Sequence, residues 1–181
     1  MNLYVLDTDP AEAARFYNDR HVQKTIKYAA LIMSAAHIYL DGETAARARV
    51  RSILNAPLTG SDWIPWTRFG NENYQWVQEL ARGLTDQYEL RFGSQHVYAV
   101  RGGLVDQLSK LPLNIERRPR SMFPQCMPKQ YRRSNPVDAY RLFYFGEKWD
   151  TREPDGSLSG WSPPSMVPSW WTEMEQKEVG T

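Results

Sequence analysis

Three polar side chains on one face of a predicted helix could carry chemistry. His21, Lys24 and Tyr28 follow one another at spacings of three and four residues, which places them on the same side of a helix. An imidazole beside an ammonium group and a phenol could bind a phosphate, or exchange protons near neutral pH. We therefore predict His21 as an acid–base residue, and Lys24 as a group that stabilises negative charge or acts as an amine nucleophile. The alternative is an ordinary solvated helix face.

A second polar group surrounds the start of another predicted helix. Arg68, Asn71 and Asn73 lie at or just before this start, and Tyr74 and Trp76 follow in the first turns. Helix N-termini attract anions through their free N–H groups and the helix dipole. Arginine with asparagine and aromatic neighbours suits a phosphate or a base edge, so we predict ligand binding by all five. The alternative is capping by the asparagines and packing of the rings.

A proline-stiffened loop and the helix after it form the third group. Gln125 lies in the segment 123–131, where prolines restrict the backbone, and its amide could pair with a base edge. The following helix carries Arg141, Tyr144 and Lys148. We predict that these side chains also bind the ligand. The alternative for Tyr144 is a position in the core.

Positive charge is grouped, although the net charge is only +1. The grouped residues are Arg47, Arg49 and Arg51, then Arg117, Arg118 and Arg120, then Arg132 and Arg133. Such groups could neutralise phosphates while a ring such as Trp76 or Tyr144 stacks on a base. We therefore predict one cavity, shared by the polar face of the His21 helix, the start of the Trp76 helix and the loop around Gln125.

Several common chemistries lack their motifs. The sequence has no Gly-rich phosphate loop, no GxSxG elbow and no paired-cysteine zinc motif. His21, His37 and His96 lack the spacing of a helical metal site, so we predict no metal and no cofactor. Cys126, the only cysteine, rules out an internal disulfide and fits a reducing compartment. It is either a small buried residue or a candidate nucleophile.

The hydrophobic pattern predicts a mainly α fold. Apolar residues in 20–40 recur every three or four positions, and Asp9-Pro10 is typical of a helix start. Helices are predicted over 10–18, 20–40, 44–54, 70–92, 104–111 and 135–149, with an extended segment at 3–6 and loops at 57–65 and 112–134. We predict a compact single-domain helical bundle over 1–149, and an irregular tail over 150–181 that its tryptophans dock onto the bundle. With no apolar run of about 18 residues and no signal peptide, we expect a cytoplasmic protein.

Motifs spread over residues 1–149 resemble a family of short, uncharacterised phage proteins. The matching motifs are Met1-Asn2-Leu3-Tyr4-Val5-Leu6-Asp7 with Asp9-Pro10, Arg20-His21-Val22 with Lys24, Asn71 with Asn73-Tyr74 and Trp76, Tyr88-Glu89 with Arg91-Phe92-Gly93 and His96, Met127-Pro128 with Tyr131, and Ala139-Tyr140-Arg141 with Tyr144 and Lys148. This resemblance implies a phage-encoded protein, and Arg91, His96 and Tyr131 complete the predicted ligand-binding set.

A more distant resemblance is to the phage-type pyrimidine-dimer DNA glycosylases, the endonuclease V class. Those compact helical enzymes have an early Asp-x-His motif, to which Asp19-Arg20-His21 is similar. Their essential glutamate stands seven residues beyond the histidine, where this chain has Tyr28. This resemblance implies DNA binding and base excision.

Together these features predict a phage-encoded protein that binds a nucleobase in nucleic acid or a nucleotide, in the host cytoplasm. If it is an enzyme, base excision or base modification is the expected class. The alternatives are a non-catalytic nucleotide sponge, which should form an oligomer, and an inhibitor of a host protein. Binding to nucleic acid should weaken steeply with salt.

Overall fold

The computed structural model describes residues 2–147 and 160–179. Within these ranges every regular element is a helix, so the fold is mainly α, as predicted. The elements are α1 (Pro10–Phe16), α2 (Asp19–Asp41), α3 (Glu43–Arg49), α4 (Trp63–Phe69), α5 (Asn71–Phe92), α6 (Leu104–Gln107), η1 (Lys129–Tyr131), α7 (Pro136–Glu147), η2 (Pro164–Met166) and α8 (Ser169–Val179). No helix in the described part of the chain is long and apolar enough to cross a membrane.

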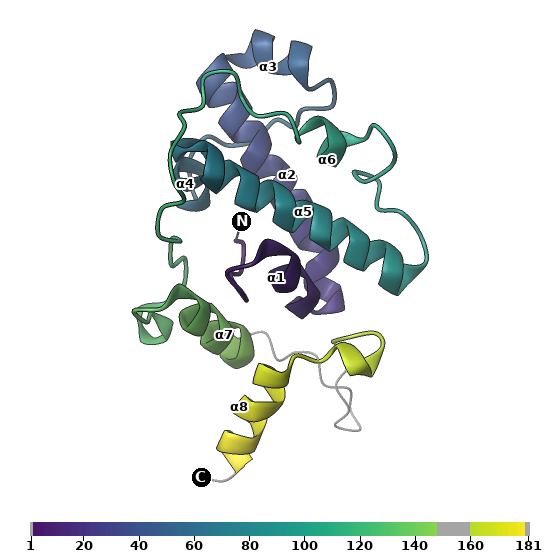
Figure 1. The fold of residues 1–181 in the computed structure, drawn as a ribbon, viewed down its shortest axis with the longest axis vertical. Helices are drawn as coiled ribbons and strands as arrows, with labels where there is room; N and C mark the ends of the chain where they lie inside the picture. Colours follow the sequence, from purple (N-terminus) through teal and green to yellow (C-terminus); the bar gives the residue numbers. More distant parts are fainter. Residues whose placement is uncertain (1, 148–159, 180–181) are drawn as a thin grey trace.

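The long helices α2 and α5 pack against each other, with α1 and α4 beside them (Figure 1). The apolar stripe predicted for α2 is buried, since Val22, Ile26 and Met33 have no exposed surface. Burial of such a stripe stabilises a helix far more than its intrinsic propensity does. The core therefore forms where the sequence pattern places it.

Residues 3–6 form a buried extended segment, and its Tyr4 packs between Tyr17, just after α1, and the helix α7. The hydroxyl of Tyr17 accepts a hydrogen bond from the Tyr4 N–H (2.6 Å) and donates one to the Tyr4 carbonyl (2.8 Å). One side chain thus satisfies both backbone groups of a buried residue, as a neighbouring strand would. On the other side, the Tyr4 ring packs edge-on against Tyr140 and Tyr144 of α7.

Three helices end earlier than predicted, and one of them, predicted over 104–111, ends at Gln107. The predicted helix 10–18 ends at Phe16, because Asn18 has an extended backbone and caps α2. The predicted helix 44–54 ends at Arg49, where Val50 becomes extended. The ends of α5 match the prediction, and Gly93 closes it in the left-handed conformation with φ of 66°, as a C-terminal glycine does.

The predicted loop 57–65 is correct over 57–62 and wrong over 63–65, since α4 begins at Trp63. Pro65 is tolerated because the first N–H groups of a helix have no partner within the helix. Burial of Trp63, Ile64 and Trp66 stabilises this short helix. It follows that Arg68 lies on a helix that packs against α2 and α5.

The C-terminal tail is helical where an irregular segment was predicted. Residues 169–179 form α8, whose start carries Trp170 and Trp171. Both rings and that of Trp161 are buried, as predicted for docking of the tail. Trp170 meets Phe16 edge-on, and Trp171 packs on Phe145. Tertiary packing of these rings, which sequence periodicity does not reveal, accounts for the helix.

Candidate functional site

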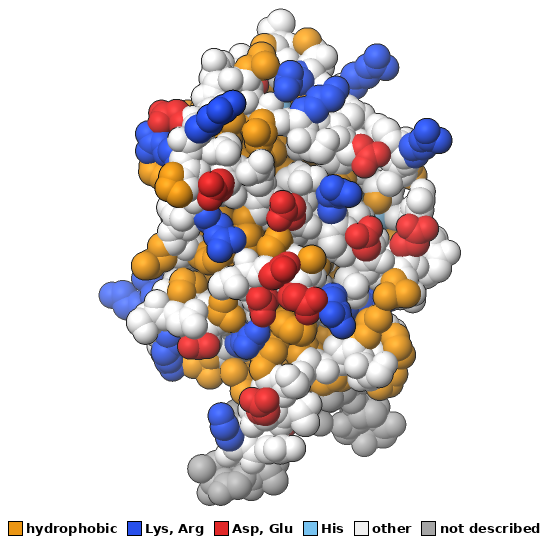
Figure 2. Space-filling view, viewed as in Figure 1, with side chains coloured by type: hydrophobic (Ala, Val, Ile, Leu, Met, Phe, Trp, Pro, Cys, Tyr) orange, Lys and Arg blue, Asp and Glu red, His pale blue; other side chains and the backbone are white. Residues whose placement is uncertain are grey.

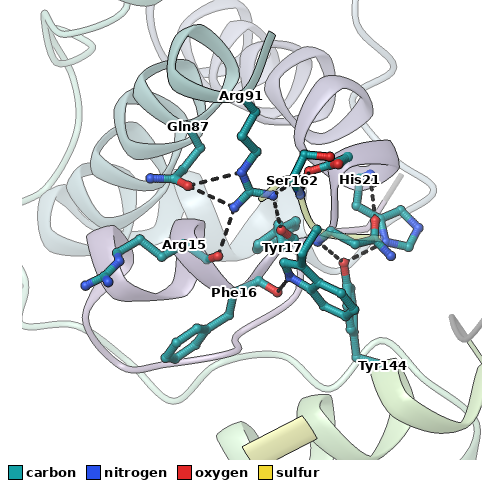
Figure 3. Close-up of polar contacts among 11 residues, drawn as sticks. Arg15, Phe16, Tyr17, His21, Gln87, Arg91, Tyr144 and Ser162 are labelled. Atoms are coloured by element: carbon teal, nitrogen blue, oxygen red, sulfur yellow. Dashed lines mark hydrogen bonds and ion pairs between the residues drawn. The ribbon is translucent and has the colours of Figure 1, made fainter. Parts of the chain in front are cut away.

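His21 lies in the first turn of α2 and is half-buried. The Asn18 side chain accepts a hydrogen bond from its N–H (2.9 Å), which caps the helix. The imidazole Nδ1 lies 2.8 Å from the hydroxyl oxygen of Tyr144 on α7, and its ring packs against Tyr4. Figure 3 shows the ring of Tyr144 pointing toward His21 from the helix below. A residue from the far end of the chain therefore orients the imidazole.

The Tyr144 hydroxyl determines which nitrogen of His21 carries the proton. This hydroxyl accepts a hydrogen bond from the Asn18 N–H (2.9 Å). Burial raises the pKa of Tyr144 well above its ordinary value, so the phenol keeps its own proton. The acceptor for that proton is His21 Nδ1, which assigns the Nε2–H tautomer to the neutral imidazole. Such an oriented imidazole can donate a proton from Nε2.

Lys24 and Tyr28 occupy different environments, although they follow His21 on α2. Lys24 is exposed, whereas Tyr28 is half-buried and packs against the core. Tyr28 also contributes to the environment of Tyr4: burial, and then the Tyr28 phenol, raise the pKa of Tyr4 to about 12. The polar face predicted for α2 is thus only partly solvated, and its Tyr28 end faces other aromatic groups.

Arg91, a predicted ligand-binding residue, is a structural group. Its side chain has no exposed surface and forms an ion pair with Asp19 at 3.0 Å. It also donates hydrogen bonds to the carbonyls of Tyr17 (2.7 Å) and Arg15 (3.0 Å) and to the Gln87 amide oxygen (2.8 Å). Figure 3 shows these contacts joining α5 to the junction of α1 and α2. Because its donors are used internally and it is buried, it is not available to a ligand.

Arg141 likewise binds the protein itself. It donates hydrogen bonds to the carbonyl of Leu6 (2.8 Å) and to the Asp7 carboxylate (3.2 Å). Its guanidinium lies over the rings of Phe16 and Trp170. Arg141 therefore holds the N-terminal segment and the C-terminal helix on α7, and the prediction that it binds a ligand finds no geometric support.

Two residues chosen from the family resemblance also have internal partners. His96 is buried, and its Nδ1 accepts a hydrogen bond from the Tyr98 N–H at 3.2 Å. Burial lowers the pKa of His96. The Tyr131 hydroxyl donates to the Glu147 carboxylate at 2.7 Å, and this hydrogen bond raises the Tyr131 pKa. Lys148, the last of the predicted residues, lies outside the described ranges.

The start of α5 holds a protein segment instead of an anion. Asn71 accepts a hydrogen bond from the N–H of Arg118 (2.8 Å). Asn73, which is fully buried, accepts from the Ser121 N–H (2.9 Å) and donates to the Trp66 carbonyl (2.7 Å). The asparagines thus fix the backbone of an arginine-rich segment over residues 116–121. Ligand binding by Asn73 was predicted wrongly, because the remote segment and the Trp66 carbonyl use both atoms of its buried amide. For Asn71, whose amide oxygen accepts from Arg118, ligand binding stays a prediction.

The rings predicted to stack on a base are in the core. Trp76 is 2% exposed, stacks on Trp63, and donates from its indole to the Thr8 carbonyl. Tyr74 and Tyr144 have no exposed surface. The prediction that Trp76 or Tyr144 offers a face to a base was therefore wrong, and any stacking surface lies elsewhere.

Gln125 pairs with the protein backbone. Its amide donates to the carbonyl of Arg133 (2.7 Å) and accepts from the N–H of the same residue (3.1 Å). The amide was predicted to pair in this way with the edge of a base. In the structure it pairs with the backbone of Arg133 and closes the proline-rich loop. Gln125 is therefore a structural residue of that loop.

One cavity joins two of the three predicted groups. Its volume is about 490 Å³, within the range of roughly 300–1,000 Å³ typical of small-molecule sites. It is lined by Asn2, Leu58, Thr59, Gly60, Ser61, Asp62, Pro65, Arg68 and Cys126. Arg68 comes from the second group and Cys126 from the proline-stiffened loop. His21 does not line this cavity, so the predicted meeting of all three groups is not observed there.

The cavity lining carries both a positive and a negative side chain, Arg68 and Asp62. The Arg68 guanidinium donates a long hydrogen bond to the Leu58 carbonyl (3.4 Å) and stacks on the Tyr39 ring, 3.6 Å from its centroid. Asp62 is exposed on the same lining, with Cys126 Sγ at 4.0 Å from its carboxylate. Burial, and then the Asp62 charge, raise the pKa of Cys126, so the thiol is a weak nucleophile. The cavity is therefore suited to binding polar ligands.

Asp62 and Tyr39 were missed by sequence reasoning. Asp62 stood in a predicted loop with no charged neighbour at a helical spacing, and Tyr39 stood near the end of a predicted helix between the apolar residues Ile38 and Leu40. The run Thr59-Gly60-Ser61-Asp62 before a helix was an available signal, since such residues often precede a helix start. Among the described residues no group of three or more His, Cys, Asp or Glu could hold a metal ion.

Comparison with protein-family models, with curated proteins and with solved structures found no match for this chain.

Proposed function

We propose that this protein binds a nucleotide in the cavity between α4 and the loop around Cys126. The observation that carries the proposal is the lining itself, in which Arg68 and Asp62 share one cavity of about 490 Å³. Arg68 supplies a cation for phosphate, and Asp62 supplies an acceptor for the N–H groups of a base or the hydroxyls of a ribose. A ligand with an anionic end and a donor-rich end fits that combination.

Arg68 is well prepared to bind phosphate. One face of its guanidinium is stacked on Tyr39, and one nitrogen is held by the Leu58 carbonyl. A guanidinium has five N–H donors, so the remaining ones can form a two-point contact with phosphate oxygens. Stacking also limits the side chain to few conformations, which reduces the entropy that binding has to remove.

The rest of the lining shapes the cavity and adds polar groups. The Asn2 amide donates to the Cys126 carbonyl (3.0 Å) and accepts from the Trp63 indole (3.0 Å), which ties the wall together. Gly60 has a φ of 96°, a backbone conformation that residues with a side chain rarely adopt. One part of the cavity wall is thus held by the hydrogen bonds of Asn2, and another part is a turn at Gly60 whose backbone conformation favours glycine.

A second candidate function is acid–base chemistry on a base at His21. It is favoured by the Tyr144 hydroxyl, which orients the imidazole at 2.8 Å, and by the exposed Lys24 one turn further on. His21→Ala separates the two candidates. Binding in the Arg68 cavity should survive this substitution, whereas loss of turnover with retained binding would support an enzyme.

The test is calorimetric titration with matched nucleosides and nucleotides, using Arg68→Gln. The wild-type protein should bind nucleotides more tightly than nucleosides. Losing a charge-assisted hydrogen bond costs roughly 1.5–3 kcal/mol, so Arg68→Gln should weaken nucleotide binding about 10- to 100-fold. Nucleoside binding should change little. The matched control is Arg82→Gln, an exposed arginine of α5 that does not line the cavity.

A thermal shift provides an independent measurement of the same binding. A nucleotide at 100 times its dissociation constant should stabilise the wild-type protein by about 2.7 kcal/mol. The proposal fails if no nucleotide binds the wild-type protein, or if Arg68→Gln and Arg82→Gln bind nucleotides equally well.

A further inference from the structure

Two exposed aromatic rings next to the cavity each carry an arginine on one face. Tyr39 is 56% exposed and lies under Arg68, and Phe69 is 47% exposed and lies under Arg118 at 4.4 Å. Single exposed apolar residues are normal on a protein surface, but rings that lie together beside a cavity mark a candidate interaction surface. Here the guanidinium covers part of each ring and leaves the remainder open to solvent.

The two stacked pairs adjoin each other and the cavity. Arg68 both lines the cavity and covers Tyr39. Phe69 follows Pro65 of the cavity lining by four residues on α4, so these two residues share a face of the helix. The surface therefore continues from the cavity to Tyr39 through Arg68, and to Phe69 along the face of α4 that carries Pro65. Figure 2 shows hydrophobic, basic and some acidic side chains along the left margin, where Figure 1 places α4 and the segment that follows α6.

The second arginine is held by the start of α5. Arg118 donates its N–H to Asn71 (2.8 Å), and the Asn71 N–H donates back to the Glu116 carbonyl (2.9 Å). A Cβ atom on Gly70 would lie 2.8 Å from the Arg118 Cβ, so only glycine permits this close approach. The α4–α5 junction thus fixes Arg118 over Phe69.

The charge around these rings favours an anionic partner. The segment 116–120 has three arginines and one glutamate. Glu116 pairs with Arg118, while Arg117 and Arg120 are exposed. Rings that alternate with arginines suit single-stranded nucleic acid, because bases stack on the rings and phosphates meet the cations. A protein partner would not require this alternation.

We propose that a single-stranded nucleic acid runs from the Arg68 cavity across Tyr39 and Phe69, with its phosphates facing Arg117 and Arg118. This inference rests on the proposed nucleotide binding and names the ligand as a strand instead of a free nucleotide. One nucleotide occupies the cavity, and the bases that follow stack on the exposed rings.

The test compares a labelled 12-nucleotide oligothymidylate with thymidine monophosphate, using fluorescence anisotropy and calorimetry. The oligonucleotide should bind more tightly than the mononucleotide. Phe69→Ala should weaken oligonucleotide binding roughly tenfold, in line with the loss of one stacked base, and Phe69→Trp should restore it. Mononucleotide binding should be unchanged in both variants. The matched control is Phe92→Ala, which removes a ring of similar exposure (44%) at the far end of α5.

Salt dependence supplies a second readout. For single strands the slope of log affinity against log salt is about −0.7 per phosphate contact. Arg117→Gln should therefore make the oligonucleotide slope less negative by roughly 0.7.

The outcomes separate this inference from the proposed function. The proposal of a bound strand is wrong if the mononucleotide binds but the oligonucleotide binds no tighter, or if Phe69→Ala and Phe92→Ala have the same oligonucleotide affinity. In either case the proposed nucleotide site is unaffected. Absence of binding by both probes overturns both proposals. If Phe69→Ala disrupts self-association and leaves oligonucleotide binding intact, the rings form a protein interface and the strand is likewise overturned.

Discussion

The two ends of α2 each carry a histidine paired with a tyrosine, and the two pairs use their hydrogen bonds in opposite directions. At the start, the Tyr144 hydroxyl donates to His21 Nδ1. Near the end, the Tyr74 hydroxyl donates to the Leu108 carbonyl (2.8 Å), so it accepts from His37 Nε2 at 3.0 Å. The same two residue types therefore make one imidazole an acceptor and the other a donor.

Burial adds a second difference between the pairs. His37 has no exposed surface, and its Nδ1 has no hydrogen-bond partner among the described residues. The Asp41 carboxylate lies 3.7 Å from Nδ1. His21 is only half-buried, at the junction of α1, α2 and α7. The enclosed pair is suited to holding the fold, whereas the half-buried pair is the one proposed for acid–base chemistry.

The largest expected effect of breaking either pair is that of Tyr74→Phe. Removal of this hydroxyl leaves the His37 Nε2–H and the Leu108 carbonyl unpaired in the core. Buried groups without partners cost roughly 1–3 kcal/mol each, so urea denaturation should show a loss of about 3 kcal/mol. Tyr98→Phe is the control, because the Tyr98 hydroxyl has no hydrogen bond to another described residue. Equal stability of the two variants would show that the enclosed pair does not hold the fold.

Tyr144→Phe should have a smaller effect on stability. It removes the partner of the buried Asn18 N–H, but water can reach the half-buried His21. The expected loss is about 1.5 kcal/mol. Double-mutant cycles of Tyr144→Phe with His21→Ala, and of Tyr74→Phe with His37→Ala, measure the two couplings directly. A larger coupling energy for the His21–Tyr144 pair than for the His37–Tyr74 pair would show that the half-buried pair contributes more to stability than the enclosed one.

The fold was largely readable from the sequence where one helix face is uniformly apolar. The stripe of α2 and the glycine at the end of α5 gave correct helices. The short helix α4 was missed, since Pro65 is usually a sign of a loop and the burial of Trp63 and Trp66 becomes evident only in the folded chain. Helix α8 was missed for the same reason, because its tryptophans pack against residues that are distant in sequence.

The candidate site is harder to predict than the fold, because the sequence does not show which polar side chains form hydrogen bonds within the protein. Asn71 and Asn73 hold a segment 47 and 48 residues further on. Gln125 pairs with Arg133, and three of the four partners of Arg91 lie more than 70 residues away. Spacing within one helix shows which side chains share a face, but it gives no information on which remote segment meets that face.

The smallest expected effect is a pH dependence of stability that comes from the enclosed pair. Burial lowers the pKa of His37, and the nearby Arg49 adds to this, while the Asp41 carboxylate and the Lys110 carbonyl oppose it. Between the lowered value and the ordinary value of about 6.5, the unfolded chain binds more protons than the folded one. The stabilisation is therefore complete above about pH 6.5 and is lost as the pH falls through that window.

His37→Gln tests this dependence, because glutamine can keep the donor to Tyr74 without titrating. The unfolding free energy of the wild-type protein should fall more between pH 7.5 and pH 5.5 than that of the variant. Burial also lowers the pKa of His96, so both proteins lose some stability, and their difference isolates His37. If the variant loses as much as the wild type, the Asp41 carboxylate compensates for burial, and the enclosed pair is no more sensitive to acid than the half-buried one.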